Sequence, residues 1–189
     1  MTDKDILNIF KTTNAILDGH FNLSSGKHSA QYLQCARILQ YPVYAEKLCK
    51  ALAEKFKESK PTVVISPAVG GILVSHEVAK ALEVKALFTE RIDGKMSLRR
   101  GFKLTKNDKV LVVEDVITTG RSTKEVIDTV KPFGAAIVGV GCLVDRSKGK
   151  VDFGLRFESL VEIDIPTFDP QNCPLCKDRI PISKPGSRK

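Results

Sequence analysis

Residues 110–123 have the sequence VLVVEDVITTGRST, which is the most informative segment of the chain. Its four leading apolar residues are typical of a short strand that is buried on both faces. Two acids, Glu114 and Asp115, follow the strand, and a loop of hydroxyl residues with Gly120 then leads into an amphipathic helix. Unpaired amides and the dipole at a helix N-terminus attract phosphate, and carboxylates accept hydrogen bonds from sugar hydroxyls. The stretch therefore predicts a site for a sugar phosphate.

A purely structural interpretation of this stretch is also available. It assigns Glu114 and Asp115 to the end of a strand and a hydroxyl residue to a helix cap. That interpretation suits an isolated pair of acids, but it does not account for the whole run. The sequence holds no G-x-x-x-x-G-K-[ST] motif, and Gly139 and Gly141 lack the third glycine of a dinucleotide fingerprint.

Outward from this stretch, short apolar segments alternate with amphipathic ones. Strands are predicted over 63–65, 86–88, 110–113 and 135–144, helices over 5–17, 42–56 and after the first and third strands, and a hairpin over 21–34. This alternation predicts an α/β fold with a parallel sheet and helices on both faces. Ligands of open parallel sheets bind at the carboxyl ends of the strands. Pro67–Gly71, Glu114–Ser122 and Asp145–Arg146 are therefore expected to line the site.

The bulk composition is that of a globular protein with one sizeable core. Hydrophobic residues make up 42% of the 189 residues, and charged residues make up 28%. No apolar run approaches the roughly 20 residues that a membrane-spanning helix needs. The N-terminus lacks the pattern of a secretory signal. We therefore expect a cytoplasmic protein with no membrane partner.

The chain is basic, with a net charge of +8 from 30 Lys and Arg against 22 Asp and Glu. Part of the excess lies in residues 91–103 and 177–189. A basic surface suits either nucleic acid or a polyphosphate substrate. Aromatic residues make up only 6% of the chain and no helix-turn-helix pattern is evident, so we expect no nucleic-acid partner.

Residues 110–123 closely resemble the PRPP-binding motif of the type I phosphoribosyltransferases. In that family the two acids contact the ribose of 5-phosphoribosyl diphosphate (PRPP), and the loop after them binds its 5′-phosphate. The resemblance implies a parallel-sheet core with helices on both faces and a small N-terminal hood segment. It further implies one domain over 1–189, with the hood at 1–40, the core at 41–165 and a tail at 166–189.

Further segments resemble the orotate phosphoribosyltransferases, one branch of that family. Residues 21–29 match the N-terminal F-x-L-x-S-G-(basic)-x-S segment, and Tyr32 falls where the branch places apolar residues against the orotate ring. Residues 67–71 resemble its pyrophosphate loop, and Arg146 matches an arginine that contacts the orotate carboxylate. The substrate-binding residues implied are Arg91, Glu114, Asp115, Val116, Ile117, Thr118, Thr119, Gly120, Arg121, Ser122 and Arg146.

The chain also departs from the pattern of the better-known bacterial enzymes. Those have lysines where Ser24 and Gly70 stand here, and their mobile loop is longer than residues 91–101. Lys95 is the only lysine near the tip of the shorter loop, so it is the candidate catalytic lysine alongside Asp115. Arg99 and Arg100 are candidates for the missing positive charge.

The resemblance implies transfer of the phosphoribosyl group from PRPP to orotate, giving orotidine 5′-monophosphate and pyrophosphate in de novo UMP synthesis. It implies Mg²⁺ as cofactor, held by PRPP and water and not by protein ligands. It also implies a homodimer in which the basic loop reaches the neighbouring subunit's site. The rival interpretations are a purine phosphoribosyltransferase of the xanthine or adenine type and a nucleic-acid-binding regulator on the same fold.

The five cysteines of the chain point in two directions. Cys35, Cys49 and Cys142 lie in apolar surroundings and are expected to be small buried residues. Cys173 and Cys176 form a C-x-x-C motif, which is half of a zinc site. No second C-x-x-C exists and the three histidines show no paired spacing, so the sequence predicts no bound zinc.

Overall fold

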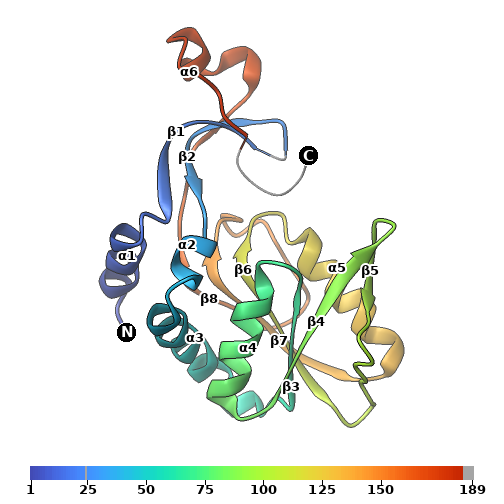
Figure 1. Ribbon diagram of the computed structural model, residues 1–189. Coiled ribbons are helices and arrows are strands. Elements are labelled where there is room, and N and C mark those ends of the chain that lie inside the picture. The colour runs from blue at the N-terminus through green and yellow to red at the C-terminus, as the bar shows by residue number, and fades with distance from the viewer. Residues whose placement is uncertain (24, 185–189) are drawn as a thin grey trace.

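The computed structural model describes residues 1–23 and 25–184. Its main feature is a six-stranded sheet in the order β5-β4-β3-β6-β7-β8 (Figure 1). The strands are β3 (Val63–Pro67), β4 (Lys85–Ile92), β5 (Lys95–Leu98), β6 (Lys109–Ile117), β7 (Ala136–Asp145) and β8 (Phe157–Glu162). All neighbouring pairs are parallel except β4 with β5. The predicted parallel sheet is confirmed, and β5 and β8 are additions that the sequence did not reveal.

Helices cover both faces of this sheet, as the alternation of apolar segments predicted. The helices are α1 (Asp3–Thr12), α2 (Ala36–Leu39), α3 (Pro42–Phe56), α4 (Gly71–Leu82), α5 (Arg121–Val130) and α6 (Pro174–Lys177), with short 3₁₀ turns at Lys57–Ser59, Lys131–Phe133 and Pro170–Asn172. Leu111 and Val113 of β6 pack in one core with α1, α3 and α4. Val110 and Val112 face the other way and pack against α5. Side chains that alternate along a strand therefore separate two cores.

The two glycines of β7 have a packing role. A Cβ atom at Gly139 would lie 2.7 Å from Cε1 of Phe56, and one at Gly141 would lie 2.9 Å from its Cε2. Phe56 ends α3 and is fully buried. The absence of side chains at these two glycines therefore leaves room for the ring of Phe56 against the strand.

A second, smaller sheet lies above the carboxyl ends of the main strands and forms the hood (Figure 1). It consists of β1 (Ile16–Asn22), β2 (His28–Leu33) and β9 (Thr167–Phe168), in the order β1-β2-β9. The hairpin predicted over 21–34 is confirmed in kind, but its first strand begins earlier, at Ile16. The helix predicted over 5–17 was therefore too long. A capping box between Thr2 and Asp5 starts α1, and Asn14, with φ of +49°, turns the chain out of the helix.

The residues expected to form a basic loop, 91–101, fold mainly as a hairpin. Ile92 pairs with Lys95 across a two-residue turn of Asp93 and Gly94, which both have positive φ. Such a turn matches the twist of the flanking strands and favours a tight hairpin. Met96 is buried against the core that contains α5 and anchors β5. Most of residues 91–101 are therefore in strands, and only a short part of the expected loop is irregular.

The C-terminal segment returns to the hood. Thr167 pairs with Ser29 of β2, and Ser183 forms a bridge with Phe21 of β1. Residues 185–189 of the expected tail, and Ser24 of the hood motif, lie outside the described residues. The division into hood, core and tail stays a prediction. No helix within the described ranges is long and apolar enough to cross a membrane.

Candidate active site

Two carboxylates lie together where β6 leaves the sheet. Glu114 is buried and Asp115 is half-buried. The backbone amide of Val116 donates a hydrogen bond of 2.9 Å to Oδ1 of Asp115. Burial raises the pKa of Asp115, and the bond from Val116 opposes that rise. The strand thus holds a carboxylate in a fixed direction at the end of the sheet.

The loop between β3 and α4 lies directly against these acids. A Cβ atom at Gly70 would be 2.8 Å from Oδ2 of Asp115, and one at Gly71 would be 2.7 Å from Cβ of Ser66 and 3.4 Å from Oε1 of Glu114. Glycine at these two positions lets the loop backbone approach the carboxylates closely. A lysine in place of Gly70, as in the better-known enzymes, would need Asp115 to shift.

The expected phosphate loop follows, at the N-terminus of α5. Gly120 caps this helix with φ of +68°, and a Cβ atom there would lie 2.7 Å from Cγ1 of Val151. Thr118 and Thr119 are exposed, and Ser122 is partly buried. A glycine-led helix start with free hydroxyls nearby has the composition of an anion site.

Three of the predicted substrate-binding residues have other roles in this structure. The side chain of Ile117 is 1% exposed and belongs to the core against α5. Val116 lies in strand β6, where its amide holds Asp115. Nε of Arg121 donates to Glu125 at 3.0 Å along the helix. Any part that Val116 and Ile117 take in binding is therefore through the backbone.

Arg146 follows β7 and faces the same end of the sheet. Its backbone amide donates to the carbonyl oxygen of Ile117 at 2.8 Å, which places it beside the acidic segment. Its Nε is buried and has no hydrogen-bond partner among the described residues. Burial lowers the pKa of Arg146, and Tyr32 partly offsets this effect. A positively charged side chain whose buried N–H group has no hydrogen-bond partner favours an anionic ligand.

Tyr32 brings the hood into this site. Burial raises the pKa of its phenol, and the nearby Asp115 raises it further while Arg146 lowers it. Its ring centroid lies 5.8 Å from that of Phe21 on the partner strand. The site is therefore bounded by acids and a glycine loop on the core side and by an aromatic ring on the hood side.

Comparisons with known proteins agree with this geometry. The phosphoribosyl transferase domain model matches residues 36–153. The orotate phosphoribosyltransferase of Desulforamulus reducens is 57% identical over 189 residues, covering 100% of this chain and 99% of the relative. That of Caldanaerobacter subterraneus is 56% identical over the full length of both chains. The chain belongs to the orotate phosphoribosyltransferase family.

A solved structure extends the likeness. The orotate phosphoribosyltransferase of Aeropyrum pernix superposes with a TM-score of 0.68 at 25% identity, covering 84% of this chain and 93% of that one. The family membership and the type I fold expected from residues 110–123 are thus confirmed.

The basic residues predicted to act as cations of the mobile loop lie on or next to the β4–β5 hairpin. The arginines among them are paired with acids. Arg100 donates from Nε and Nη2 to the carboxylate of Glu90, at 2.8 and 2.9 Å. Arg91 forms an ion pair with Glu125 of α5. Lys95 is exposed at the tip, and no ion pair within the described ranges joins it to Glu114 or Asp115. Glu90 and Glu125, which anchor these arginines, were not noticed in the sequence.

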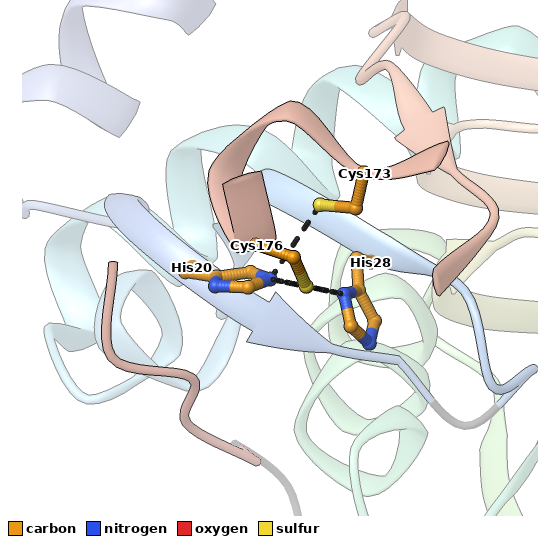
Figure 2. Close-up of side chains that lie close together, drawn as sticks. All are labelled: His20, His28, Cys173 and Cys176. Atoms are coloured by element: carbon orange, nitrogen blue, oxygen red, sulfur yellow. Dashed lines mark hydrogen bonds between the residues drawn. The ribbon is translucent and has the colours of Figure 1, made fainter. Parts of the chain in front are cut away.

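A second cluster of chemically active side chains lies in the hood. Cys173 and Cys176 meet His20 and His28, and the ligand atoms of all four lie within 4.8 Å of one another (Figure 2). No bound zinc was predicted because the sequence has no second C-x-x-C motif and its three histidines show no paired spacing. The spacing criterion was misleading, because the hairpin brings His20 and His28 together beside the two cysteines. Cys35, Cys49 and Cys142 are buried, as predicted.

Proposed function

We propose that this protein transfers the 5-phosphoribosyl group from PRPP to N1 of orotate, releasing pyrophosphate. The observation that carries the proposal is Arg146, a half-buried arginine whose buried Nε has no partner among the described residues and whose backbone bonds to the end of the acidic strand. Orotate differs from uracil by a carboxylate, which such a guanidinium would bind. The full-length likeness to relatives named orotate phosphoribosyltransferase supports the same substrate.

We assign the parts of PRPP to the three loops at this edge of the sheet. Glu114 and Asp115 accept hydrogen bonds from the ribose hydroxyls, and residues 118–122 bind the 5′-phosphate through hydroxyls and the α5 N-terminus. The backbone of residues 67–71 faces the pyrophosphate. Asp115, next to the ribose, stabilises positive charge as the bond to pyrophosphate breaks.

The donor set fits a Mg²⁺ ion that enters with the substrate. Mg²⁺ prefers oxygen ligands, and the negative charge of Glu114 and Asp115 lies beside a loop whose glycines leave no side chain in the way of such an ion. When bound to PRPP, Mg²⁺ would neutralise charge on the departing pyrophosphate. We expect the oxygens of PRPP and water to supply its coordination.

A base panel tests the proposed reaction. With PRPP and Mg²⁺, orotate should give orotidine 5′-monophosphate and pyrophosphate, whereas uracil, hypoxanthine, xanthine and adenine should give little or no product. Product is measured by chromatography with each base at the same concentration. Turnover of a purine in the absence of turnover of orotate would replace this proposal with the purine interpretation.

We further propose that the β4–β5 hairpin acts on the departing pyrophosphate and that it does so across a homodimer. Exposed apolar side chains lie on α3 and at α4, with Val43 74% and Leu73 49% exposed, and they suit burial against a second copy. Lys95 at the hairpin tip has its charge available for the site. A cytoplasmic location accords with this activity and stays a prediction.

Lys95→Ala is expected to lower kcat by about 10²-fold while changing KM for orotate by less than about threefold. The lost charge acts on negative charge that develops at pyrophosphate, so its effect belongs mainly to the transition state. Steady-state kinetics measures both constants, and Lys106→Ala, a change at another exposed lysine, is the control. An equal rise in KM with unchanged kcat would contradict this role.

Mixed dimers test whether the hairpin serves the partner. Combining a Lys95→Ala chain with an Asp115→Ala chain should restore activity, since each mixed dimer then holds one intact site. If heterodimers form and no activity returns, the hairpin serves its own subunit.

A further inference from the structure

The His–Cys cluster joins three separate segments of the chain at the outer end of the hood. His20 lies on β1, His28 begins β2, and the two cysteines flank Pro174 and Leu175 at the start of α6 (Figure 2). His20, His28 and Cys173 are 3%, 8% and 1% exposed, and Cys176 is exposed. Figure 2 shows the four side chains pointing toward one another.

The following distances within the cluster are close to those of a tetrahedral coordination shell. Nε2 of His20 lies 3.0 Å from Nδ1 of His28, 3.6 Å from Sγ of Cys173 and 3.8 Å from Sγ of Cys176. Sγ of Cys176 lies 3.3 Å from Nδ1 of His28. Around a tetrahedral zinc ion, with bonds near 2.0–2.1 Å to nitrogen and 2.3 Å to sulfur, neighbouring ligand atoms are about 3.3–3.8 Å apart.

The orientation of His20 supports the same interpretation. Its Nδ1 lies 2.8 Å from the carbonyl oxygen of Ile180, and a carbonyl can only accept, so Nδ1 carries the proton. In a neutral imidazole the lone pair is then on Nε2, the atom that faces both thiols and the second ring. A backbone carbonyl that accepts this proton and so fixes the ring is the usual arrangement at metal-bound histidine.

Hydrogen bonds join the C-terminal segment to this end of the hood, but the apolar packing there is limited. Phe21 and Cys173 are buried there, yet neither belongs to either of the two hydrophobic clusters found among the described residues. A small sheet without a core of its own is commonly held together by a metal or disulfides. The cysteines of this chain are free thiols.

We propose that His20, His28, Cys173 and Cys176 bind one zinc ion that fastens the C-terminal segment to the β1–β2 hairpin. Two thiolates and two imidazoles in a tetrahedron favour zinc over the harder cations. Four protein ligands leave no open position, so the ion is structural and takes no part in the transfer reaction. The site lies in the hood and is separate from the acids of β6, which would face Mg²⁺.

Metal content of the purified full-length protein tests the proposal independently of activity. Elemental analysis after growth with added zinc should give about one zinc per chain. Cys176→Ser is the most informative variant, because Cys176 is exposed and its loss removes a ligand with little packing; zinc should fall at least tenfold. Cys49→Ala, which removes a buried thiol elsewhere, and His76→Gln, at an exposed histidine, should keep the full amount.

Cobalt provides a second readout that does not depend on a variant folding. Co²⁺ added to the reduced, metal-stripped wild-type protein should produce thiolate-to-cobalt charge-transfer absorption, and one equivalent of Zn²⁺ should abolish it. Absence of both zinc and the cobalt spectrum in the wild type would overturn the proposal. Full retention of zinc by Cys176→Ser would also overturn it.

Discussion

Asp115→Asn is expected to lower kcat by about 10²–10³-fold while leaving the protein at least as stable as the wild type at pH 7. Asparagine keeps the oxygen that accepts the hydrogen bond from the Val116 amide, so the local geometry is retained. The charge that would stabilise the developing positive ribose is removed. A large loss of activity with no loss of stability would separate a chemical role of Asp115 from a structural one.

The direction of the stability change follows from the pKa. Burial raises the pKa of Asp115 in the folded protein, so the folded state binds this proton more tightly than the unfolded chain does. The stabilisation that protonated Asp115 gives to the folded state is complete below the ordinary Asp pKa. It is lost as the pH rises through the raised pKa of Asp115 in the folded protein. At neutral pH the ionised carboxylate therefore opposes folding, and asparagine should raise Tm there, with the gain shrinking toward acidic pH.

Thermal unfolding between acidic and neutral pH, together with kcat at pH 7, measures both effects. Asp128→Asn is a suitable control, because Asp128 is an exposed acid on α5 that pairs with Lys131. It should change neither quantity appreciably. Wild-type kcat in Asp115→Asn, or a variant that loses its folded structure, would contradict the proposed role.

The second large effect is expected at Arg146. Truncating one member of a buried charge pair costs about 2–5 kcal/mol, so Arg146→Ala should raise KM for orotate by about 10²-fold or more. KM for PRPP should change little, because Arg146 is assigned to the base. Lys148→Ala removes an exposed positive charge two residues away and is the matched control.

Competition between bases makes this experiment specific. In the wild type, orotate should inhibit binding of a labelled orotate far better than uracil, which lacks the carboxylate. In Arg146→Ala the advantage of orotate over uracil should collapse, while the affinity for uracil stays near its wild-type value. Equal weakening of both bases would mean that Arg146 shapes the site without contacting the carboxylate.

The core of the fold could be predicted because its signals are local. Pro42 begins α3 and Phe56 ends it, as the apolar spacing predicted. The run around Val110–Val113 is a central strand, and its acids lie at the sheet edge as expected. In each case the residues that determine the structure are neighbours in sequence.

Features that depend on distant contacts were missed. Strand β8 pairs with β7, but its sequence, FESLVE, mixes charge with apolar residues and gives no clear period. The His–Cys cluster needs both the hairpin pairing and the return of residues separated from it by about 150 positions. The sequence did offer a signal for this cluster. It was a predicted hairpin that carries two histidines, together with a C-x-x-C motif in a chain without disulfides.

The hood sheet also ties the first part of the chain to the last part that the structure describes. Strands β1 and β2 leave the ribosome early, but their partner β9 and the segment that reaches Ser183 leave among the last residues described. The hood sheet is therefore completed last in synthesis, after the strands of the core have been made. Tyr32 does not wait for this step, because it pairs with Leu17 of β1 and its ring lies near that of Phe21. A nascent chain can therefore place the aromatic side of its site before the C-terminal segment closes the hood.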